Sequence, residues 1–258
     1  MPDTPPYVPA HQLLDGKTVL VTAAAGAGIG YATAKRCLEE GASVVVSDKH
    51  ERRLAEASER LAEFGKVACS IPCDVTDGAS VESLFKDAIG VTGGLDVVVN
   101  NAGLGGTADL VDMSDDDWNL VIDVSLNGTF RCTRAALRHM IPRGSGVIIN
   151  LSSILGWRAQ SGQAHYAAAK AGVAALTRAA AMEAAPSGVR VNCVAPSFAE
   201  TPFLAKVVSA ETLQELRARE AFGRAAEPWE VANVIVFLAS DYSSYMTGEV
   251  VSVSAQHP

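Results

Sequence analysis

Thr18-Val-Leu-Val-Thr-Ala-Ala-Ala-Gly-Ala-Gly-Ile-Gly30 runs directly into Tyr31-Ala-Thr-Ala-Lys-Arg36, and this stretch decides the fold. The β-branched run Thr18–Thr22 predicts a strand, and the residues from Gly28 onward predict a helix. Glycines between them permit a tight turn, and the N–H groups at the positive end of the helix attract a pyrophosphate. The stretch therefore predicts a dinucleotide-binding turn, with an ordinary strand-to-helix connection as the alternative if the glycines are taken alone.

Short β-branched runs alternate with longer helical patterns along the rest of the chain. Strands are predicted at Thr18–Thr22, Ser43–Ser47, Val67–Cys73, Leu95–Asn100, Gly146–Leu151, Val189–Val194 and Val250–Val253. Helices are predicted near Gly28–Glu40, Glu51–Glu63, Ala79–Val91, Asp115–Met140, Ala164–Ala184 and Pro228–Ala239. This alternation predicts an α/β fold: a doubly wound, parallel, seven-stranded sheet with helices on both faces and a ligand crevice at the carboxyl ends of the strands.

Composition indicates a single globular domain of ordinary character. The chain has 258 residues, 48% of them hydrophobic, and a net charge of −8, which argues against nucleic acid or an anionic membrane as a partner. Residues 1–12, with several prolines, predict an extended arm before one domain over 13–258, and about 201–224 predict a lid-like helical insertion. The odd count of five cysteines predicts reduced thiols and no metal site, and a cytoplasmic location is expected because no signal peptide or spanning run is present.

The end of the second predicted strand indicates which dinucleotide is bound. Asp48 lies there, where its carboxylate can accept hydrogen bonds from both ribose hydroxyls of an adenosine. Repulsion between this carboxylate and a 2′-phosphate favours NAD. Lys49, Arg52 and Arg53 follow closely and can offset that repulsion, so NADP stays open.

The ends of the third and fourth strands add further cofactor candidates. Asp74, with the Val75 backbone beside it, is predicted to accept the adenine amino group or, alternatively, to cap a turn. Asn100-Asn101-Ala102-Gly103 closes the fourth strand at the same edge of the sheet. We expect these amides to tie strand ends together and to line the crevice of the nicotinamide ribose.

Two tyrosines are followed by a lysine four residues later, Tyr31 with Lys35 and Tyr166 with Lys170, but only Tyr166 stands 13 residues after Ser153 (166 − 153), near the end of a strand. Residues four apart share a helix face, so the Lys170 ammonium is expected near the phenol. A cation about 4 Å away at a dielectric near 20 supplies about 4 kcal/mol, enough to lower a phenol pKa from about 10 toward 7. Tyr166 is thus predicted to be the general acid or base, Ser153 to hold the substrate oxygen, and Lys170 also to reach the nicotinamide ribose. A surface Tyr–Lys pair is the alternative.

The order and spacing of these motifs resemble the short-chain dehydrogenase/reductase family over about Leu14 to Val253. The resemblance implies a Rossmann-type sheet, nicotinamide-dependent interconversion of a secondary alcohol and a ketone, no metal, and a homotetramer or homodimer built through the last two long helices. It implies a catalytic set of Ser153, Tyr166, Lys170 and Ser125. It implies cofactor contacts at Thr22, Ala24, Gly28, Ile29, Gly30, Asp48, Asp74, Val75, Asn101, Ala102, Gly103, Tyr166, Lys170, Pro196 and Thr201.

The sequence departs from the family pattern at four places. Ala23 occupies the first glycine position, in a turn that is one residue longer. Ser125 stands where the family commonly has a relay asparagine, with Asn127 two positions later. Ser197 replaces the glycine after Pro196, and the common terminal Asp-Gly-Gly is absent. These departures leave a catalytically weak dinucleotide-binding sensor or scaffold as an alternative.

A narrower resemblance concerns the substrate. The segments 22–26, 156–160 and 221–230 and the Gln-His-Pro ending are similar to actinobacterial reductases of late steroid catabolism (cholesterol rings C and D), which act on hydroxylated bicyclic acyl-CoA thioesters. Trp157, Arg158, Gln163 and His165 lie between Ser153 and Tyr166 and are predicted to line the substrate pocket or, alternatively, to be solvated loop residues. A 3-oxoacyl-CoA or 3-oxoacyl-carrier-protein reductase is the alternative, because the same catalytic set serves it equally well.

Overall fold

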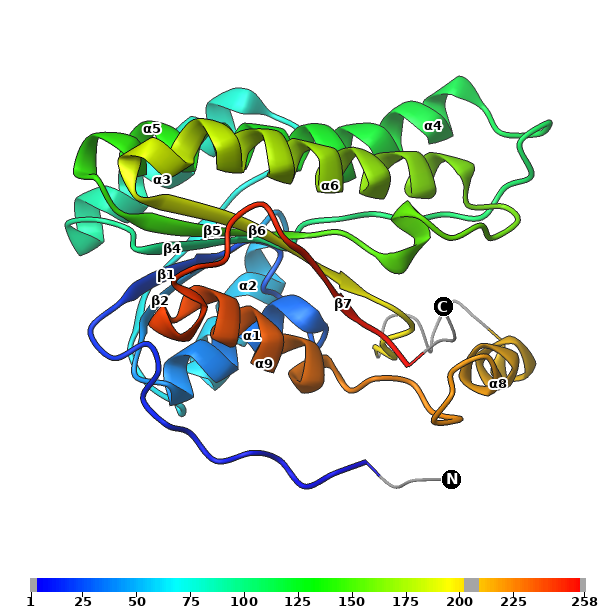
Figure 1. Cartoon of the computed structure of the whole chain (residues 1–258), viewed down its shortest axis with the longest axis horizontal. Helices are drawn as coiled ribbons and strands as arrows, with labels where there is room; N and C mark the ends of the chain where they lie inside the picture. Colours follow the sequence, from blue (N-terminus) through cyan, green and yellow to red (C-terminus); the bar gives the residue numbers. More distant parts are fainter. Residues whose placement is uncertain (1–3, 202–208, 256–258) are drawn as a thin grey trace.

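A parallel sheet runs through the middle of the structure, a computed structural model that describes residues 4–201 and 209–255 (Figure 1). Its strands are β1 (Thr18–Val21), β2 (Ser43–Asp48), β3 (Val67–Pro72), β4 (Val97–Asn100), β5 (Gly146–Leu151), β6 (Val189–Pro196) and β7 (Val250–Val253). They are ordered β3-β2-β1-β4-β5-β6-β7, and all neighbours are parallel. The chain moves outward from β1 to β3 and then returns to pair β4 with the other side of β1. The predicted fold is confirmed, and this reversal opens a crevice beyond the carboxyl ends of β1 and β4.

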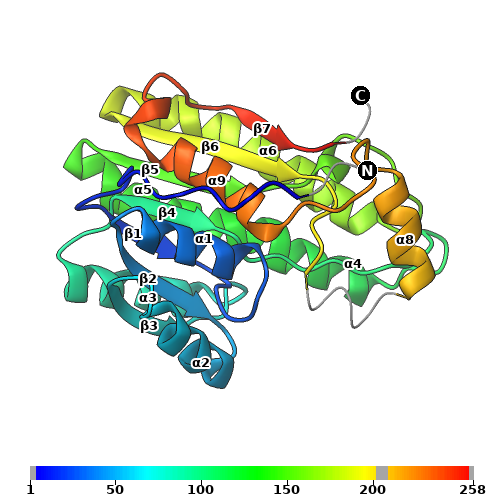
Figure 2. The same ribbon diagram turned by 90° about the horizontal axis from the view of Figure 1, so that it is seen from below.

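Helices cover both faces of the sheet (Figures 1 and 2). They are α1 (Ile29–Glu39), α2 (Glu51–Leu61), α3 (Gly78–Thr92), α4 (Asp115–Ile122), α5 (Gly128–Arg143), α6 (Ala164–Ala184), α8 (Ala210–Ala218) and α9 (Pro228–Ala239). The layer with α1, α2 and α9 lies on one face, and the layer with α3 to α6 lies on the other. Helix α8 belongs to the predicted insertion 201–224, of which residues 202–208 lie outside the described residues.

The predicted continuous helix Asp115–Met140 is wrong. A π-helical turn, Asp123–Asn127, separates α4 from α5. In this turn the Ser125 hydroxyl both donates to the Leu104 carbonyl and accepts from the Leu104 N–H, each at 2.9 Å. A contact with a distant loop therefore accompanies the local break in helical register, and such wide turns often occur at functional sites.

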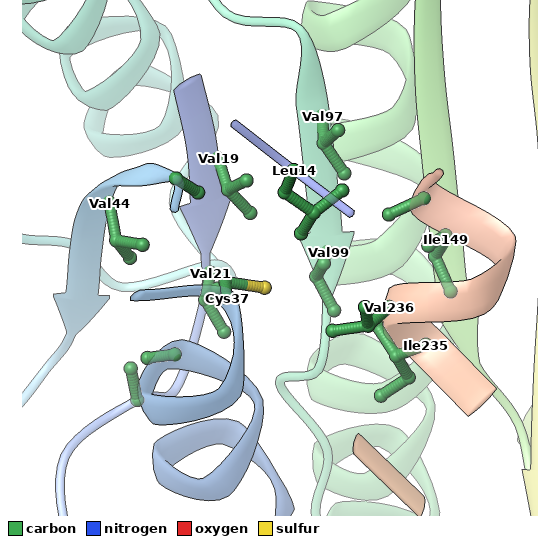
Figure 3. Packing of buried hydrophobic residues seen from close by; sticks show 14 of the residues in the cluster. Leu14, Val19, Val21, Cys37, Val44, Val97, Val99, Ile149, Ile235 and Val236 are labelled. Atoms are coloured by element: carbon green, nitrogen blue, oxygen red, sulfur yellow. The ribbon is translucent and has the colours of Figure 1, made fainter. Parts of the chain in front are cut away.

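Two apolar clusters hold the helical layers to the sheet. Figure 3 shows the cluster between the sheet and the helices α1 and α9, where Val21 and Val99 lie near Cys37 and Ile235. The second cluster joins the opposite face of the strands to α3, α5 and α6. Strands covered on both faces need apolar side chains at successive positions, which explains the valine runs of β2 and β4. Each fully buried valine stabilises the fold by about 1.5–3 kcal/mol relative to exposure.

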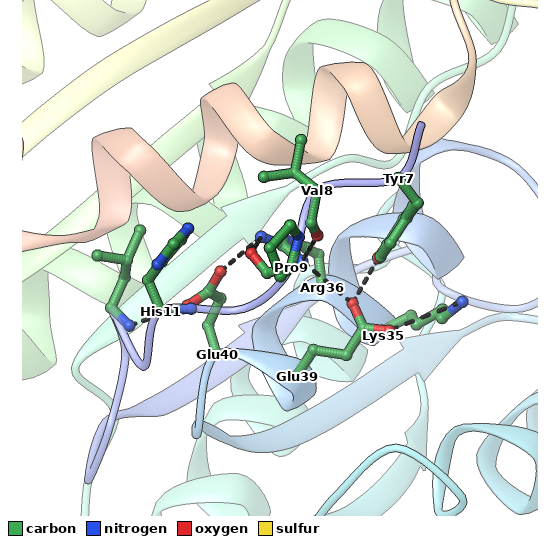
Figure 4. Close-up of polar contacts among 9 residues, drawn as sticks. Tyr7, Val8, Pro9, His11, Lys35, Arg36, Glu39 and Glu40 are labelled. Atoms are coloured by element: carbon green, nitrogen blue, oxygen red, sulfur yellow. Dashed lines mark hydrogen bonds and ion pairs between the residues drawn. The ribbon is translucent and has the colours of Figure 1, made fainter. Parts of the chain in front are cut away.

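The N-terminal arm, residues 4–12, crosses the α1–α9 layer without a helix or strand of its own (Figure 4). Arg36 of α1 donates to the carbonyl oxygens of Val8 and Pro9 at 2.9 and 3.1 Å. Glu40, ion-paired with Arg36 at 2.7 Å, accepts from the His11 N–H. A buried charge pair thus fixes the path of the arm. Within the described ranges, no helix is long and apolar enough to cross a bilayer.

Candidate active site

A cavity of about 150 Å³ opens where β1, β2, β3 and β4 end. Residues from all four strand ends and from the π-helical turn line it: Thr22, Ala23, Ser47, Asp48, Lys49, His50, Cys73, Asp74, Val75, Ala102, Gly103, Leu104 and Val124. Six of the predicted cofactor residues are among them, namely Thr22, Asp48, Asp74, Val75, Ala102 and Gly103. Sequence reasoning did not assign Ala23, Ser47, His50, Cys73, Leu104 or Val124 to the cofactor, and Leu104 and Val124 carry no polar or glycine signal.

The glycine turn leads from this cavity into α1. Gly28 caps the helix without a side-chain hydrogen bond, and the first turn contains no acidic residue, so no side chain of the helix competes for its first N–H groups. A Cβ on Gly30 would lie 2.3 Å from the Ala23 carbonyl oxygen and 2.5 Å from Asn101 Nδ2. Thr201 lies across the turn, with its Cγ2 3.6 Å from where a Gly28 Cβ would be. Ile29 opens the helix between these two glycines.

Thr22 and Asn101 tie the ends of β1 and β4 together. The Thr22 hydroxyl accepts from the backbone N–H groups of Asn101 and Ala102 at 3.0 and 3.2 Å. The Asn101 amide donates to the carbonyl oxygens of Thr22 and Ala23, each at 3.1 Å. Asn101 therefore ties the ends of two strands together, as predicted for the Asn-Asn-Ala-Gly segment. The tie also holds Ala23 in a left-handed conformation, with φ of 51°.

Asp48 lies half-buried at the lip of the cavity. Its carboxylate accepts from the backbone N–H groups of Ala25 at 3.3 Å and His50 at 3.0 Å. Burial raises the pKa of Asp48, while the hydrogen bond from Ala25 and the charges of Arg53 and Lys49 act in the opposite direction. The carboxylate is thus fixed beside the glycine turn, where a ribose would approach.

The carboxylate of Asp74 caps the turn that follows β3. Its carboxylate accepts from the Thr76 N–H at 2.9 Å and the Thr76 hydroxyl at 2.7 Å, and these bonds lower the pKa of Asp74. The carbonyl of Val75 accepts from Arg131 at 3.1 Å. The turn-capping alternative for Asp74 is thus observed, and Asp74 also lines the cavity.

These features fit a nicotinamide dinucleotide. An uncapped helix N-terminus suits a pyrophosphate, and a carboxylate at the end of β2 suits a ribose diol. Gly30, whose Cβ would strike backbone and amide atoms, keeps the helix tight against the strand ends. Pro196 ends β6 at the same edge of the sheet, and Ala24 is buried behind the turn.

Ser153, Tyr166 and Lys170 come together beside this cavity. Ser153 caps a short 3-10 helix just after β5, and Tyr166 and Lys170 lie one turn apart at the start of α6. Lys170 Nζ is 5.6 Å from the centre of the Tyr166 ring and donates to the Leu151 carbonyl at 2.7 Å. The Ser152 hydroxyl donates to the Lys170 carbonyl at 2.7 Å, which joins β5 to α6.

The charge state of these groups differs from the expectation. Burial raises the pKa of Tyr166, and the hydrogen bond with Ser153 offsets only part of the effect. Burial lowers the pKa of Lys170 to about 8, with the neighbouring Cys193 thiol acting in the opposite direction. The net shift of the Tyr166 pKa in this structure is therefore upward, because burial disfavours the phenolate more than the hydrogen bond with Ser153 favours it. The phenol is a proton donor as it stands.

Ser125 and Lys170 approach the same glycine. A Cβ on Gly103 would lie 3.2 Å from Lys170 Nζ and 3.8 Å from the Ser125 hydroxyl oxygen. Asn127, the nearby amide, donates instead to Asp123 at 3.0 Å. Ser125 therefore occupies the place beside Lys170, whereas Asn127 does not.

The predicted substrate residues differ in their surroundings. Trp157 is half-exposed and Arg158 partly buried, both just after the short helix that Ser153 caps. Gln163 is committed to the loop after β4, because its amide donates to the Gly106 carbonyl at 2.7 Å and to the Thr107 hydroxyl at 3.2 Å.

The second Tyr–Lys pair lies elsewhere. Lys35 stacks on the rings of Tyr7 and Phe64, and Tyr31 packs against Arg60. Neither side chain of this pair lines the cavity at the strand ends.

Comparison with known proteins agrees with this arrangement. Residues 23–255 match a family model described as enoyl-(acyl carrier protein) reductase. The chain belongs to the short-chain dehydrogenase/reductase family. It is 60% identical, over 98% of each chain, to the (5R,7aS)-5-hydroxy-7a-methyl-1-oxo-2,3,5,6,7,7a-hexahydro-1H-indene-carboxyl-CoA reductase of Mycobacterium tuberculosis. It is 44% identical to cis-4-hydroxycyclohexanecarboxylate dehydrogenase of Sinomonas cyclohexanicum, over 91% of this chain and 94% of that one.

A solved structure shows the same fold. A short-chain dehydrogenase from Mycobacterium smegmatis superposes with a TM-score of 0.88 at 53% identity, covering 99% of both chains. As a short-chain dehydrogenase/reductase, the protein is an oxidoreductase that uses NAD(H) or NADP(H) to interconvert alcohol and ketone groups of a small molecule. The alternative of a sensor or scaffold without turnover is therefore not retained.

Proposed function

We propose that this short-chain dehydrogenase/reductase interconverts a hydroxyl and a ketone on the ring of a bicyclic acyl-CoA thioester. The observation that carries the proposal is the convergence of Ser153, Tyr166 and Lys170 beside the strand-end cavity. The substrate class is supported by the Mycobacterium tuberculosis relative, whose name specifies a hydroxylated indene-carboxyl-CoA.

In the proposed mechanism of reduction, Ser153 and Tyr166 hold the ketone oxygen between two hydroxyl groups. A dinucleotide held by the glycine turn and Asp48 would supply the hydride that the carbonyl carbon receives. Tyr166 donates its phenolic proton to the developing alkoxide, and Ser153 stabilises the same oxygen. The Lys170 ammonium, 5.6 Å from the ring centre, offsets part of the charge of the resulting phenolate, and the phenolate regains its proton from solvent.

Replacement of Tyr166 tests the reaction. Tyr166→Phe is expected to reduce kcat by about 10²- to 10⁴-fold, because the proton donor is removed, while cofactor binding is retained. Tyr31→Phe, in the second Tyr–Lys pair, is the matched control and is expected to keep wild-type kcat. The measurement is nicotinamide absorbance with a bicyclic hydroxy acyl-CoA. Near-normal turnover by the Tyr166 variant would remove this residue from the mechanism.

The second candidate function is reduction of a linear 3-oxoacyl thioester. It is favoured by a relative 41% identical to this chain, the 3-oxoacyl-[acyl-carrier-protein] reductase of Thermotoga maritima. The same assay distinguishes the two candidates. A higher kcat/KM on acetoacetyl-CoA than on the bicyclic thioester would make the linear reductase the better assignment.

We further propose that NAD(H) is preferred over NADP(H). Support comes from Asp48, whose half-buried carboxylate is fixed by the N–H groups of Ala25 and His50 where a 2′-phosphate would lie. We expect kcat/KM to be at least about tenfold higher with NAD(H), and Asp48→Asn to narrow that ratio by removing the negative charge. Tighter binding of NADP(H) by the wild-type enzyme would contradict this preference.

A homotetramer or homodimer is the proposed assembly. Support comes from the outer surface of α5 and α6, where a cavity of about 430 Å³ is lined by apolar groups that include Phe130, Ile141 and Leu176. Phe130 and Ile141 are exposed in the single chain. Light scattering is expected to give a mass of two or four chains, and a monomer at micromolar concentration would exclude the proposal.

A further inference from the structure

Arg60, one residue before the end of α2, reaches the glycine turn between β1 and α1. Its guanidinium donates to the Gly26 carbonyl at 3.0 Å and to the Glu56 carbonyl of its own helix at 3.4 Å. It also lies over the ring of Tyr31, 4.7 Å from the ring centre. This last contact involves the ring alone, so Tyr31→Phe retains it. The guanidinium therefore joins α2 to the glycine turn and to the first turn of α1.

Gly26 depends on such an external contact, because its own backbone is permissive. Its φ is 115°, a conformation that L-residues rarely adopt, and a Cβ there would meet nothing within 4 Å. The turn is also one residue longer than the family pattern. In the described part of the chain, Arg60 supplies the only hydrogen bond to the Gly26 carbonyl. The orientation of this peptide group is therefore set by a side chain 34 residues away.

The direction of the Gly26 carbonyl decides the direction of the next N–H. The peptide that links Gly26 to Ala27 is trans and planar, so its C=O and N–H point in opposite directions. With the carbonyl turned toward α2, the Ala27 N–H is turned away from α2. Gly28 and Ile29 follow directly and open α1, whose first N–H groups are the expected pyrophosphate site. The bond from Arg60 thus sets the course of the backbone immediately before those groups.

The preceding residue of the same turn is held from the cavity by Asp48. The carboxylate of Asp48 accepts from the Ala25 N–H at 3.3 Å and lines the cavity at the strand ends. Two successive residues of the turn are therefore fixed by side chains from two elements, Ala25 by β2 and Gly26 by α2. A site that is already ordered loses less conformational entropy when it binds its ligand.

We propose that Arg60 is a positioning residue for the dinucleotide, which holds the glycine turn in the conformation that receives the pyrophosphate. It acts through the Gly26 backbone, whereas Ser153 and Tyr166 act on the reacting oxygen. This role requires only the dinucleotide that the family uses, so it can be tested without the bicyclic thioester. A failure of the enzyme on that thioester would therefore leave the role of Arg60 standing.

Two variants and a matched control separate the bond from the charge. Arg60→Met removes the donors and keeps an apolar stem, and Arg60→Lys keeps the charge and a donor as the conservative rescue. Arg52→Met is the control, because it removes the same charge from the same helix, at a side chain that is 87% exposed and paired with Glu56. The probes are NADH and ADP-ribose, which contain the pyrophosphate without a 2′-phosphate, and adenosine, which contains neither.

For Arg60→Met, we expect the dissociation constants of NADH and ADP-ribose to rise about threefold to tenfold, because the turn loses one charged hydrogen-bond donor. The dissociation constant of adenosine is expected to change less than about twofold. Arg60→Lys is expected to recover part of the loss, and Arg52→Met to bind all three probes as the wild-type enzyme does. The urea midpoint reports whether each variant is folded.

Hydrogen exchange in the cofactor-free enzyme measures the order of the turn directly. The Ala25 N–H, which is bonded to Asp48, exchanges only when the turn opens locally. We expect this N–H to exchange at least about threefold faster in Arg60→Met than in Arg52→Met, because the variant without the bond to Gly26 opens more often.

Three results would overturn the role of Arg60. Unchanged binding of NADH, or unchanged exchange of the Ala25 N–H, would show that the turn is ordered without it. Equal losses for adenosine and ADP-ribose would indicate a general disturbance of the site, since loss of the positioned turn selects the pyrophosphate. A loss of the same size in Arg52→Met would assign the effect to the net charge of α2 and not to the bond with Gly26.

Discussion

Ala23 has a backbone conformation that suits glycine. Its φ of 51° lies in the left-handed region, which costs an L-residue about 1–2 kcal/mol. Ala23→Gly relieves this cost but adds freedom to the unfolded chain, worth about 0.4–1 kcal/mol. We therefore expect the variant to be more stable by about 0.5–1 kcal/mol, measured by urea unfolding. The control Ala32→Gly, inside α1, is expected to be destabilising by about 1 kcal/mol. A less stable Ala23→Gly protein would contradict the strain.

Lys170 makes stability depend on pH in a predictable direction. Burial lowers its pKa from about 10.5 to about 8 in the folded protein. Between these values the unfolded chain binds more protons than the folded one, so this residue causes the free energy of unfolding to rise with pH. The contribution is fully unfavourable below about pH 8 and is removed as pH rises toward 10.5.

Comparison with Lys170→Met isolates this effect from the buried cysteines, whose raised pKa values act in the opposite direction. Between about pH 7.5 and about pH 9.5, the wild-type protein is expected to gain about 2 kcal/mol relative to the variant, at 1.36 kcal/mol per pKa unit. The measurement is denaturant unfolding at both pH values and one protein concentration. Parallel pH profiles for the two proteins would show that Lys170 is not desolvated.

At the scale of elements, the sheet was predictable because parallel strands buried on both faces appear as runs of valine and isoleucine. The predicted β4 began too early, at Leu95 instead of Val97, and β6 continues to Pro196. Spacing also predicted that Tyr166 and Lys170 share one face of α6, since four residues make about one turn. The local sequence pattern is therefore sufficient to predict the strands, the helices and the pairing of Tyr166 with Lys170 on α6.

Features that depend on contacts between distant segments were not predictable in this way. The π-helical turn around Ser125 has no periodic signal, because its hydroxyl bonds to Leu104, 21 residues earlier. The direction of the Tyr166 pKa shift was missed for the same reason, since burial is a property of the assembled fold.

At the scale of the whole molecule, the arm connects parts of the chain that the sheet alone does not join. Tyr7 packs edge-on against Trp229 of α9, with ring centres 5.3 Å apart, and its hydroxyl donates to Glu39 of α1. Helix α1 also begins at the glycine turn, so the arm braces the helix that we expect to meet the pyrophosphate. The arm is therefore part of the folded unit, although it precedes the first strand.

The buried pair Arg36–Glu40 is expected to be the main support of this arrangement. Arg36 is 4% exposed and Glu40 is fully buried. Arg36→Met removes the donors to Val8 and Pro9 and leaves the Glu40 carboxylate without its counter-charge. Breaking such a pair from one side costs about 3–5 kcal/mol, and we expect a loss of that size in urea unfolding.

Two further variants show whether the lost stability comes from the unpaired charge or from the arm. Adding Glu40→Gln to Arg36→Met removes the buried charge, so part of the stability is expected to return if the unpaired carboxylate dominates. Arg52→Met breaks the exposed pair with Glu56 and is expected to leave the midpoint unchanged. An Arg36→Met protein as stable as the wild type would contradict this prediction. It would show that the Arg36–Glu40 pair makes no net contribution to the free energy of unfolding, and that the contact of Tyr7 with Trp229 is sufficient to hold the arm.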